Sequence, residues 1–123
     1  MKVLVVEDDA DQLAVRCLLL ARNGFEAIEA ADPASARDAA RREELACAVL
    51  DLRLPDERTG VQLVCELKGI NPQLRIILFT GTSAARLASY PELRLVDDVV
   101  QKSSGFSSLI EKLKGTSAAG AHG

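Results

Sequence analysis

The segment Ala48–Pro55, with the sequence AVLDLRLP, places the carboxylate of Asp51 directly after a short apolar run. Such a run is typical of a strand buried on both faces of a sheet, and a proline soon afterwards stops regular structure. In open parallel α/β sheets, ligands bind in the crevice at the carboxyl ends of the strands. The segment therefore predicts that Asp51 lies in a functional site at one edge of a parallel sheet.

The size and composition of the chain limit the classes of protein to consider. Its 123 residues, of which 48% are hydrophobic and 27% charged, suit one globular domain with its own core. The net charge of -3 argues against direct binding to nucleic acid, which needs a basic surface. No apolar run could span a bilayer and no signal peptide precedes the first apolar run, so we expect a cytoplasmic protein with no membrane partner.

The three cysteines, Cys17, Cys47 and Cys65, are widely spaced and form no CxxC pair. We expect them to be small buried hydrophobic residues in a reducing compartment. A catalytic thiol would need a histidine nearby, and the only histidine is His122 near the carboxyl terminus. The cysteines therefore give no reason to expect thiol chemistry.

Short apolar runs alternate with helical patterns along the chain. The predicted strands cover residues 2–6, 25–29, 47–50, 75–79 and part of 93–100, and the predicted helices cover 11–22, 33–43, 61–70, 83–89 and 106–113. Strand–helix units with short links predict an α/β fold, a (βα)5 doubly wound parallel sheet covered on both faces. We predict one domain over residues 1–115 and a disordered tail over residues 116–123.

Polar side chains follow four of these strands at the point where each strand ends: Glu7 and Asp8, then Asp51, then Thr80, then Lys102. In the strand order 2-1-3-4-5, which is a general example of this architecture, the first and third strands are neighbours. This order would bring the three carboxylates together. Two like charges about 4 Å apart repel by roughly 4 kcal/mol at an effective dielectric constant near 20, so such a cluster favours a bound cation.

Oxygen ligands without histidine or cysteine indicate Mg²⁺, which commonly takes one or two carboxylates and keeps several waters. A carboxylate beside Mg²⁺, such as that of Asp51, can accept a phosphoryl group. Lys102 would supply an opposing positive charge, and Thr80 would supply a hydroxyl donor. The backbone N–H of Gly81 could add a further donor, because glycine lets a phosphoryl oxygen approach closely.

Each of these residues alone has an ordinary structural explanation. Acidic residues after a first strand often stabilise the start of a helix, and Asp51 could be a turn residue before Pro55. Thr80-Gly81 is a common strand exit, and a lysine such as Lys102 is usually solvated. The occurrence of all of them at successive strand ends favours a functional site.

From Lys2 to Lys114 the chain resembles the receiver domain of two-component response regulators, including CheY-like single-domain regulators with a flavodoxin-like fold. The resemblance rests on an ordered set of motifs: Val5–Asp9, Leu50–Pro55, Thr80-Gly81 and Lys102. It implies that Asp51 accepts a phosphoryl group from a phosphohistidine on a sensor histidine kinase or a histidine phosphotransfer protein. The protein would then promote its own phosphorylation and dephosphorylation without being a conventional enzyme.

The resemblance also implies roles for the other residues. Glu7 and Asp8 match the acidic pair that holds Mg²⁺, with Asp8 and Asp51 as direct ligands together with the backbone carbonyl of Arg53. Asp9 lies one position past this pair and is expected to be a charge at a helix start. The signal would pass to an unidentified downstream protein through a changed surface around residues 83–110, and we expect a monomer or a weak dimer.

Two departures from the family pattern favour a second hypothesis. Ser103 follows Lys102 where the family has proline, and Val99 stands where the family has an aromatic ring. The alternative is a degenerate receiver that acts as a phosphorylation-independent binding or dimerisation module. A third hypothesis, a flavodoxin-like cofactor binder, needs a phosphate-cradling loop after the first strand, and Glu7–Asp9 would repel phosphate there.

Overall fold

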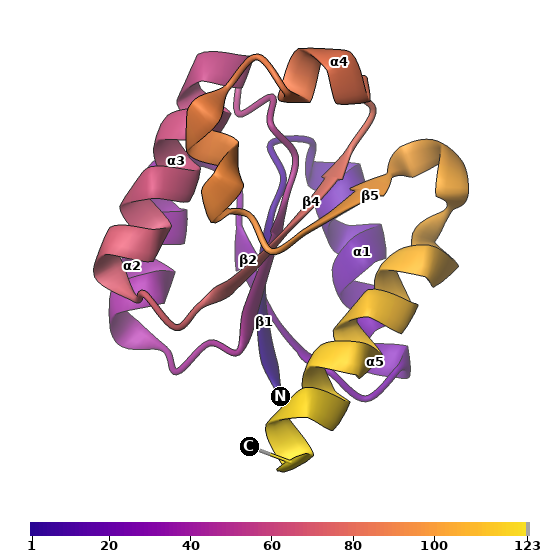
Figure 1. The fold of residues 1–123 in the computed structure, drawn as a ribbon. Helices are drawn as coiled ribbons and strands as arrows, with labels where there is room; N and C mark the ends of the chain where they lie inside the picture. The colour runs from indigo at the N-terminus through magenta and orange to yellow at the C-terminus, as the bar shows by residue number, and fades with distance from the viewer. Residues whose placement is uncertain (123) are drawn as a thin grey trace.

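A computed structural model describes the backbone of residues 1–122 and the side chains of residues 1–115. One sheet of five parallel strands has the order β2-β1-β3-β4-β5, which confirms the predicted fold class and strand order. The strands are β1 (Lys2–Val6), β2 (Glu26–Ala30), β3 (Cys47–Leu50), β4 (Arg75–Thr80) and β5 (Asp98–Gln101). Their carboxyl ends lie together at the top of the molecule in Figure 1.

Helices cover both faces of the sheet (Figure 1). On one face lie α1 (Ala10–Arg22) and α5 (Phe106–His122), and on the other lie α2 (Pro33–Arg42) and α3 (Glu57–Ile70). Each face has its own apolar core, because alternate residues of a buried strand point to opposite sides. The chain between β4 and β5 forms only the short helix α4 (Ala84–Leu87) and a 3₁₀ turn, η1 (Pro91–Leu95). A second 3₁₀ turn, η2 (Lys102–Ser104), follows β5.

Side-chain caps fix the helix starts near the site. The Asp32 carboxylate and the Ser35 hydroxyl form a reciprocal capping box at the start of α2, with Pro33 at its first turn. The Asp9 side chain accepts a hydrogen bond from the backbone N–H of Gln12 at 3.0 Å, which confirms its expected role at a helix start. Acidic caps also complement the positive end of the helix dipole.

Two predicted helix boundaries were wrong for local reasons. α3 begins at Glu57 instead of residue 61, because Asp56 caps it by accepting from the backbone N–H of Thr59. The helix expected over residues 83–89 is limited to Ala84–Leu87. The strand expected over part of residues 93–100 is present as Asp98–Gln101. The 3₁₀ turn over Pro91–Leu95 occupies the residues between them.

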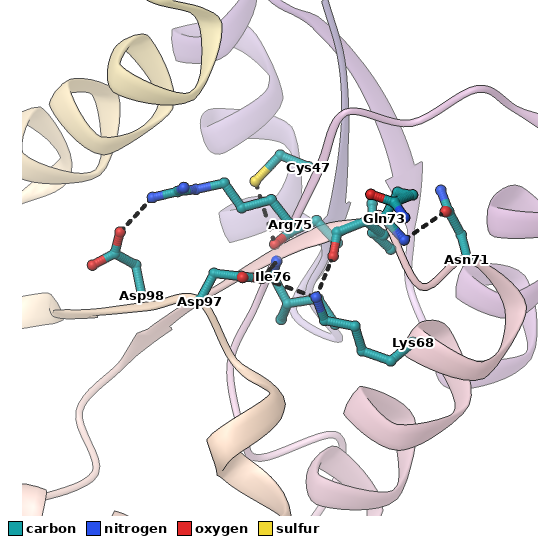
Figure 2. Close-up of polar contacts among 10 residues, drawn as sticks. Cys47, Lys68, Asn71, Gln73, Arg75, Ile76, Asp97 and Asp98 are labelled. Carbon is teal, nitrogen blue, oxygen red and sulfur yellow. Dashed lines mark hydrogen bonds and ion pairs between the residues drawn. The ribbon is translucent and has the colours of Figure 1, made fainter. Parts of the chain in front are cut away.

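Two adjacent aspartates, Asp97 and Asp98, fix the start of β5 (Figure 2). The Asp97 carboxylate accepts from the backbone N–H of Ile76 at 2.8 Å and from Lys68 Nζ at 3.1 Å. The neighbouring Asp98 carboxylate accepts from the Arg75 guanidinium at 2.6 Å. These contacts join β5 to β4 and α3 at the end of the sheet opposite Asp51.

We expect Asp97→Ala to lower the free energy of unfolding by about 1–2 kcal/mol, because it removes a charge-assisted bond to a backbone N–H together with an ion pair. Urea unfolding measures the change. Asp38→Ala is the control, because the contact of Asp38 among residues 1–115 is an exposed ion pair at 3.8 Å with Arg41. The effect of this substitution should stay within about 0.5 kcal/mol. Equal effects of the two substitutions would contradict the assigned role of Asp97.

All three cysteines are free thiols, and the prediction that they are buried holds fully only for Cys47. Burial raises the pKa of Cys47 to about 12 and that of the half-buried Cys17 to about 11. Both thiols therefore stay protonated, and so unreactive, at neutral pH.

α5 continues past Lys114, but the side chains of residues 116–122 and all of Gly123 lie outside the described part, so the disordered tail over 116–123 stays a prediction. Within residues 1–122, no helix combines the length and apolarity needed to cross a membrane.

Candidate functional site

Asp51 lies immediately after β3, at the carboxyl edge of the sheet. Its Oδ2 accepts from Lys102 Nζ at 2.7 Å, and its Oδ1 accepts from the backbone N–H of Leu52 at 2.6 Å. Partial burial raises the pKa of Asp51, but hydrogen bonds from Lys102 and Thr80 lower this pKa by more. The pKa of Asp51 therefore lies below its ordinary value. The carboxylate is therefore ionised at neutral pH and able to act as a nucleophile.

We expect Lys102→Met to raise the pKa of Asp51, because the ammonium group stabilises the ionised carboxylate. A carbon-13 NMR titration of the Asp51 carboxyl carbon in metal-free protein measures this pKa. Because the pKa is depressed on folding, Asp51 contributes stability above its unfolded-state pKa and loses this contribution as the pH falls through its folded-state pKa. The Lys102→Met variant should therefore lose less stability than the wild type as the pH falls. The control variant, Lys114→Met, should leave the titration of Asp51 unchanged. An unshifted titration in Lys102→Met would contradict the ion pair.

The end of β4 supplies hydroxyl and backbone groups beside Asp51. Thr80 is fully buried, and its hydroxyl oxygen lies 3.0 Å from that of Thr82 and accepts from the Thr82 backbone N–H at 3.0 Å. The Gln101 side-chain amide donates to the Thr82 carbonyl at 2.9 Å and so links this turn to β5. Gly81 lines a cavity together with Asp51 and Lys102.

The acidic residues after β1 reach the same region from the neighbouring strand. Glu7, Asp8, Asp51 and Arg53 line one cavity of about 450 Å³. Glu7 is buried, whereas Asp8 and Asp9 are exposed. Glu7, Asp8, Asp51, Arg53, Gly81 and Lys102 line two cavities that share Asp51, Arg53 and Lys102, whereas Thr80 is fully buried at the end of β4 and lines neither cavity.

Glu7, Asp8 and Asp51 line one cavity, as the strand order predicts, but their carboxylates do not face one another as three unpaired charges. The buried guanidinium of Arg16 donates to Glu7 Oε2, and the backbone N–H of Asp9 donates to Glu7 Oε1 at 3.1 Å. Among residues 1–115, no three His, Cys, Asp or Glu side chains are grouped so that they could hold a metal ion together. The charge of Glu7 is therefore neutralised within the protein and not by a required cation.

The remaining donors still fit Mg²⁺. Asp8 and Asp51 offer two carboxylates in one cavity, and Arg53 lines the same cavity. Mg²⁺ is commonly held by one or two carboxylates and keeps several waters, so it does not need a third acid. The donor set is therefore chemically suitable, with Glu7 engaged elsewhere.

The larger cavity, of about 1130 Å³, contains contacts that the sequence did not predict. Glu57 Oε1 accepts from the Tyr90 hydroxyl at 2.8 Å and from Arg86 Nε at 2.6 Å. These bonds lower the pKa of Glu57 and join the start of α3 to the segment after β4. Sequence spacing gave no signal for these contacts, because the three residues come from different elements.

The buried position of Arg16 was also not predicted, although the spacing of residues in α1 indicates it. Arg16 occupies the apolar stripe of α1 together with Leu13 and Leu20, at spacings of a buried helix face. A charged residue within such a stripe indicates a buried ion pair.

A doubly wound parallel sheet with an aspartate after β3, acids after β1 and a lysine after β5 defines the class of signalling receiver modules. The family model described as the response regulator receiver domain matches residues 3–114, and the chain belongs to this family. Receiver domains are signalling modules, not conventional enzymes.

Relatives of known sequence and structure agree with this assignment. The transcriptional regulatory protein TcrX of Mycobacterium tuberculosis is 35% identical over 82 residues, which are 67% of this chain and 35% of TcrX. This chain therefore spans about a third of that relative. A CheY-like receiver domain from Methanospirillum hungatei has the same fold, with a TM-score of 0.85, 24% identity and coverage of 99% of this chain and 98% of the other.

The response regulator TrrA of Thermotoga maritima has a TM-score of 0.82 and 25% identity, with 94% of this chain and 97% of TrrA covered. TrrA was solved in complex with Mg(2+)-BeF, and in a separate crystal in complex with the histidine kinase ThkA.

Proposed function

We propose that this protein is a phosphoacceptor receiver in which Asp51 takes a phosphoryl group from a phosphohistidine with the help of Mg²⁺. The observation that carries the proposal is the Asp51 carboxylate at the end of β3, held by Lys102 at 2.7 Å with a lowered pKa. Because it is ionised and opens onto two cavities, it can meet a phosphoryl donor from solvent.

In the proposed reaction, an Asp51 carboxylate oxygen attacks phosphorus, the new P–O bond forms as the P–N bond to the donor imidazole breaks, and the imidazole takes up a proton. Mg²⁺, held by Asp8, Asp51 and the Arg53 carbonyl, would neutralise charge on the carboxylate and on the phosphoryl oxygens. Lys102 would exchange its bond to Asp51 for one to a phosphoryl oxygen. Thr80 and the backbone N–H of Gly81 would donate to the remaining oxygens.

The donor would be a sensor histidine kinase or a histidine phosphotransfer protein, and the ThkA–TrrA complex shows that a related receiver binds its kinase. Signal output would be a changed binding surface around residues 83–110, recognised by a downstream protein. Glu57 lines the cavity of Asp51 and accepts hydrogen bonds from Arg86 and Tyr90, which belong to this surface.

Purified protein treated with a small phosphodonor such as acetyl phosphate tests the proposal. We expect a mass increase of one phosphoryl group that requires Mg²⁺ and is lost in alkali, as an acyl phosphate should be. The absence of this adduct in the presence of metal, with no response to beryllofluoride either, would overturn the proposal.

One observation favours the degenerate receiver as a second candidate. Val99 is 44% exposed and places no ring beside Thr80, while the ring of Tyr90 is held by its bond to Glu57. A module of this kind would bind its partner equally well with and without a phosphoryl group on Asp51. Binding of a partner that is identical for Asp51→Ala and wild-type protein would support this candidate over the first.

A further inference from the structure

Arg16 is an arginine with almost no access to solvent. Its side chain is 7% exposed and lies on the inner face of α1. The centre of the guanidinium lies 5.2 Å from the centroid of the Phe79 ring, within the range of a cation–π contact. A charged group this deeply buried is stable only with a partner of opposite charge.

The partner is Glu7, the first acid after β1. Arg16 donates to Glu7 Oε2, and the backbone N–H of Asp9 donates to Glu7 Oε1. Both carboxylate oxygens are therefore occupied, and the side chain is fixed from two directions. Glu7 is 6% exposed, so water contributes little to satisfying it.

The pairing changes the charge of the cavity that Glu7, Asp8 and Asp51 line. Arg16 lines this cavity as well, and it neutralises Glu7 as Lys102 neutralises Asp51. Asp8 is exposed beside them. In this cavity the carboxylate of Glu7 is therefore bound to the buried guanidinium of Arg16 and is not available to a cation that enters.

We propose that Arg16 is a positioning residue that withholds Glu7 from the divalent cation, so that the site binds Mg²⁺ through Asp8 and Asp51 and more weakly than its three acids would allow. The inference rests on the proposed function for the presence of a cation at Asp51. A purely structural role for Arg16, as a link between α1 and β1, predicts no gain of metal affinity when the arginine is removed.

Arg16→Met tests the proposal, because methionine has a similar length and can pack against the Phe79 ring without a charge. Mg²⁺ is titrated into the purified full chain by isothermal titration calorimetry. We expect the dissociation constant to fall by about fivefold or more, which is the lower end of typical coupling between sites. Unchanged or weaker binding of Mg²⁺ by Arg16→Met would overturn the proposal.

The double variant Glu7→Gln/Arg16→Met covers the case in which the single variant does not fold. Replacing both partners of a buried ion pair by neutral groups is often tolerated, whereas removing one partner is costly. Since Glu7 is withheld from the cation in the wild-type protein, the double variant should bind Mg²⁺ as the wild type does. A large loss of affinity in the double variant would show that Glu7 is a ligand and would overturn the proposal.

The same measurements separate the two proposals. If wild-type protein binds Mg²⁺ but takes no phosphoryl group, the proposed function fails while the Arg16 comparison is still decided by the dissociation constants. If only Arg16→Met binds Mg²⁺, the proposed withholding of Glu7 is supported in its strongest form. If neither protein binds Mg²⁺, the proposal for Arg16 is overturned.

Discussion

Asp51→Asn should abolish phosphoryl incorporation from acetyl phosphate, to below one part in a thousand of the wild-type rate, since removal of a catalytic nucleophile commonly costs at least about 10³-fold. The amide keeps the size of the side chain but has no ionised oxygen to attack phosphorus. Its remaining carbonyl oxygen can still accept one of the two hydrogen bonds made by Lys102 and the Leu52 N–H. Mass spectrometry of the intact protein measures the adduct.

Asp56→Asn is the matched control for Asp51→Asn. Asp56 lines the same cavity as Asp51, and its side chain caps α3 by accepting from Thr59. Asparagine is an equally good capping residue, so the fold and the cavity should be preserved. Phosphorylation should continue in Asp56→Asn, and phosphorylation that continues in Asp51→Asn would place the acceptor at another residue.

Gly60→Ala should lower the free energy of unfolding by about 3 kcal/mol or more, at the upper end of the cost of overpacking. A Cβ on Gly60 would lie 1.7 Å from the carbonyl oxygen of Leu52. The collision is with backbone, so the loop after Asp51 must move for the helix to remain in place. Because the Leu52 N–H donates to Asp51 Oδ1, the same movement should slow phosphorylation.

Gly69→Ala is the control for Gly60→Ala, since it makes the same substitution in the same helix. A Cβ on Gly69 would meet nothing within 4 Å. Alanine there should raise the free energy of unfolding by about 0.5–1 kcal/mol, because it restricts the unfolded chain and favours helix. Equal unfolding midpoints for the two variants in urea would refute the close approach of α3 to Leu52.

The fold followed from the sequence because its signals are local. Apolar runs such as Val3–Val6 and Ile76–Phe79 are fully buried strands, and alternation of strands with helices limits the topology to a few choices. Boundaries near polar side chains were less predictable. Asp56 and Asp97 each form a specific bond to a backbone N–H that decides where an element starts, and composition does not reveal such a bond.

The site followed from the sequence only in part. The order of the strands and the position of each residue along them were enough to place Asp51 and Lys102 at one edge, where the structure pairs them. The state of Glu7 was not predictable in the same way, because its partner comes from the buried face of a helix. Pairing between elements depends on side-chain direction, which strand-end positions do not specify.

The Asp97 contacts have a mechanical consequence for Lys102. They anchor the amino end of β5 to β4 and α3, while the residue directly after the carboxyl end carries the ammonium group bound to Asp51. A strand of four residues at about 3.3 Å per residue spans roughly 13 Å, and β5 is paired with β4 along this whole length, from Asp98 to Gln101. When Lys102 changes its hydrogen-bond partner, the flexible lysine side chain moves while the strand before it stays fixed to the sheet.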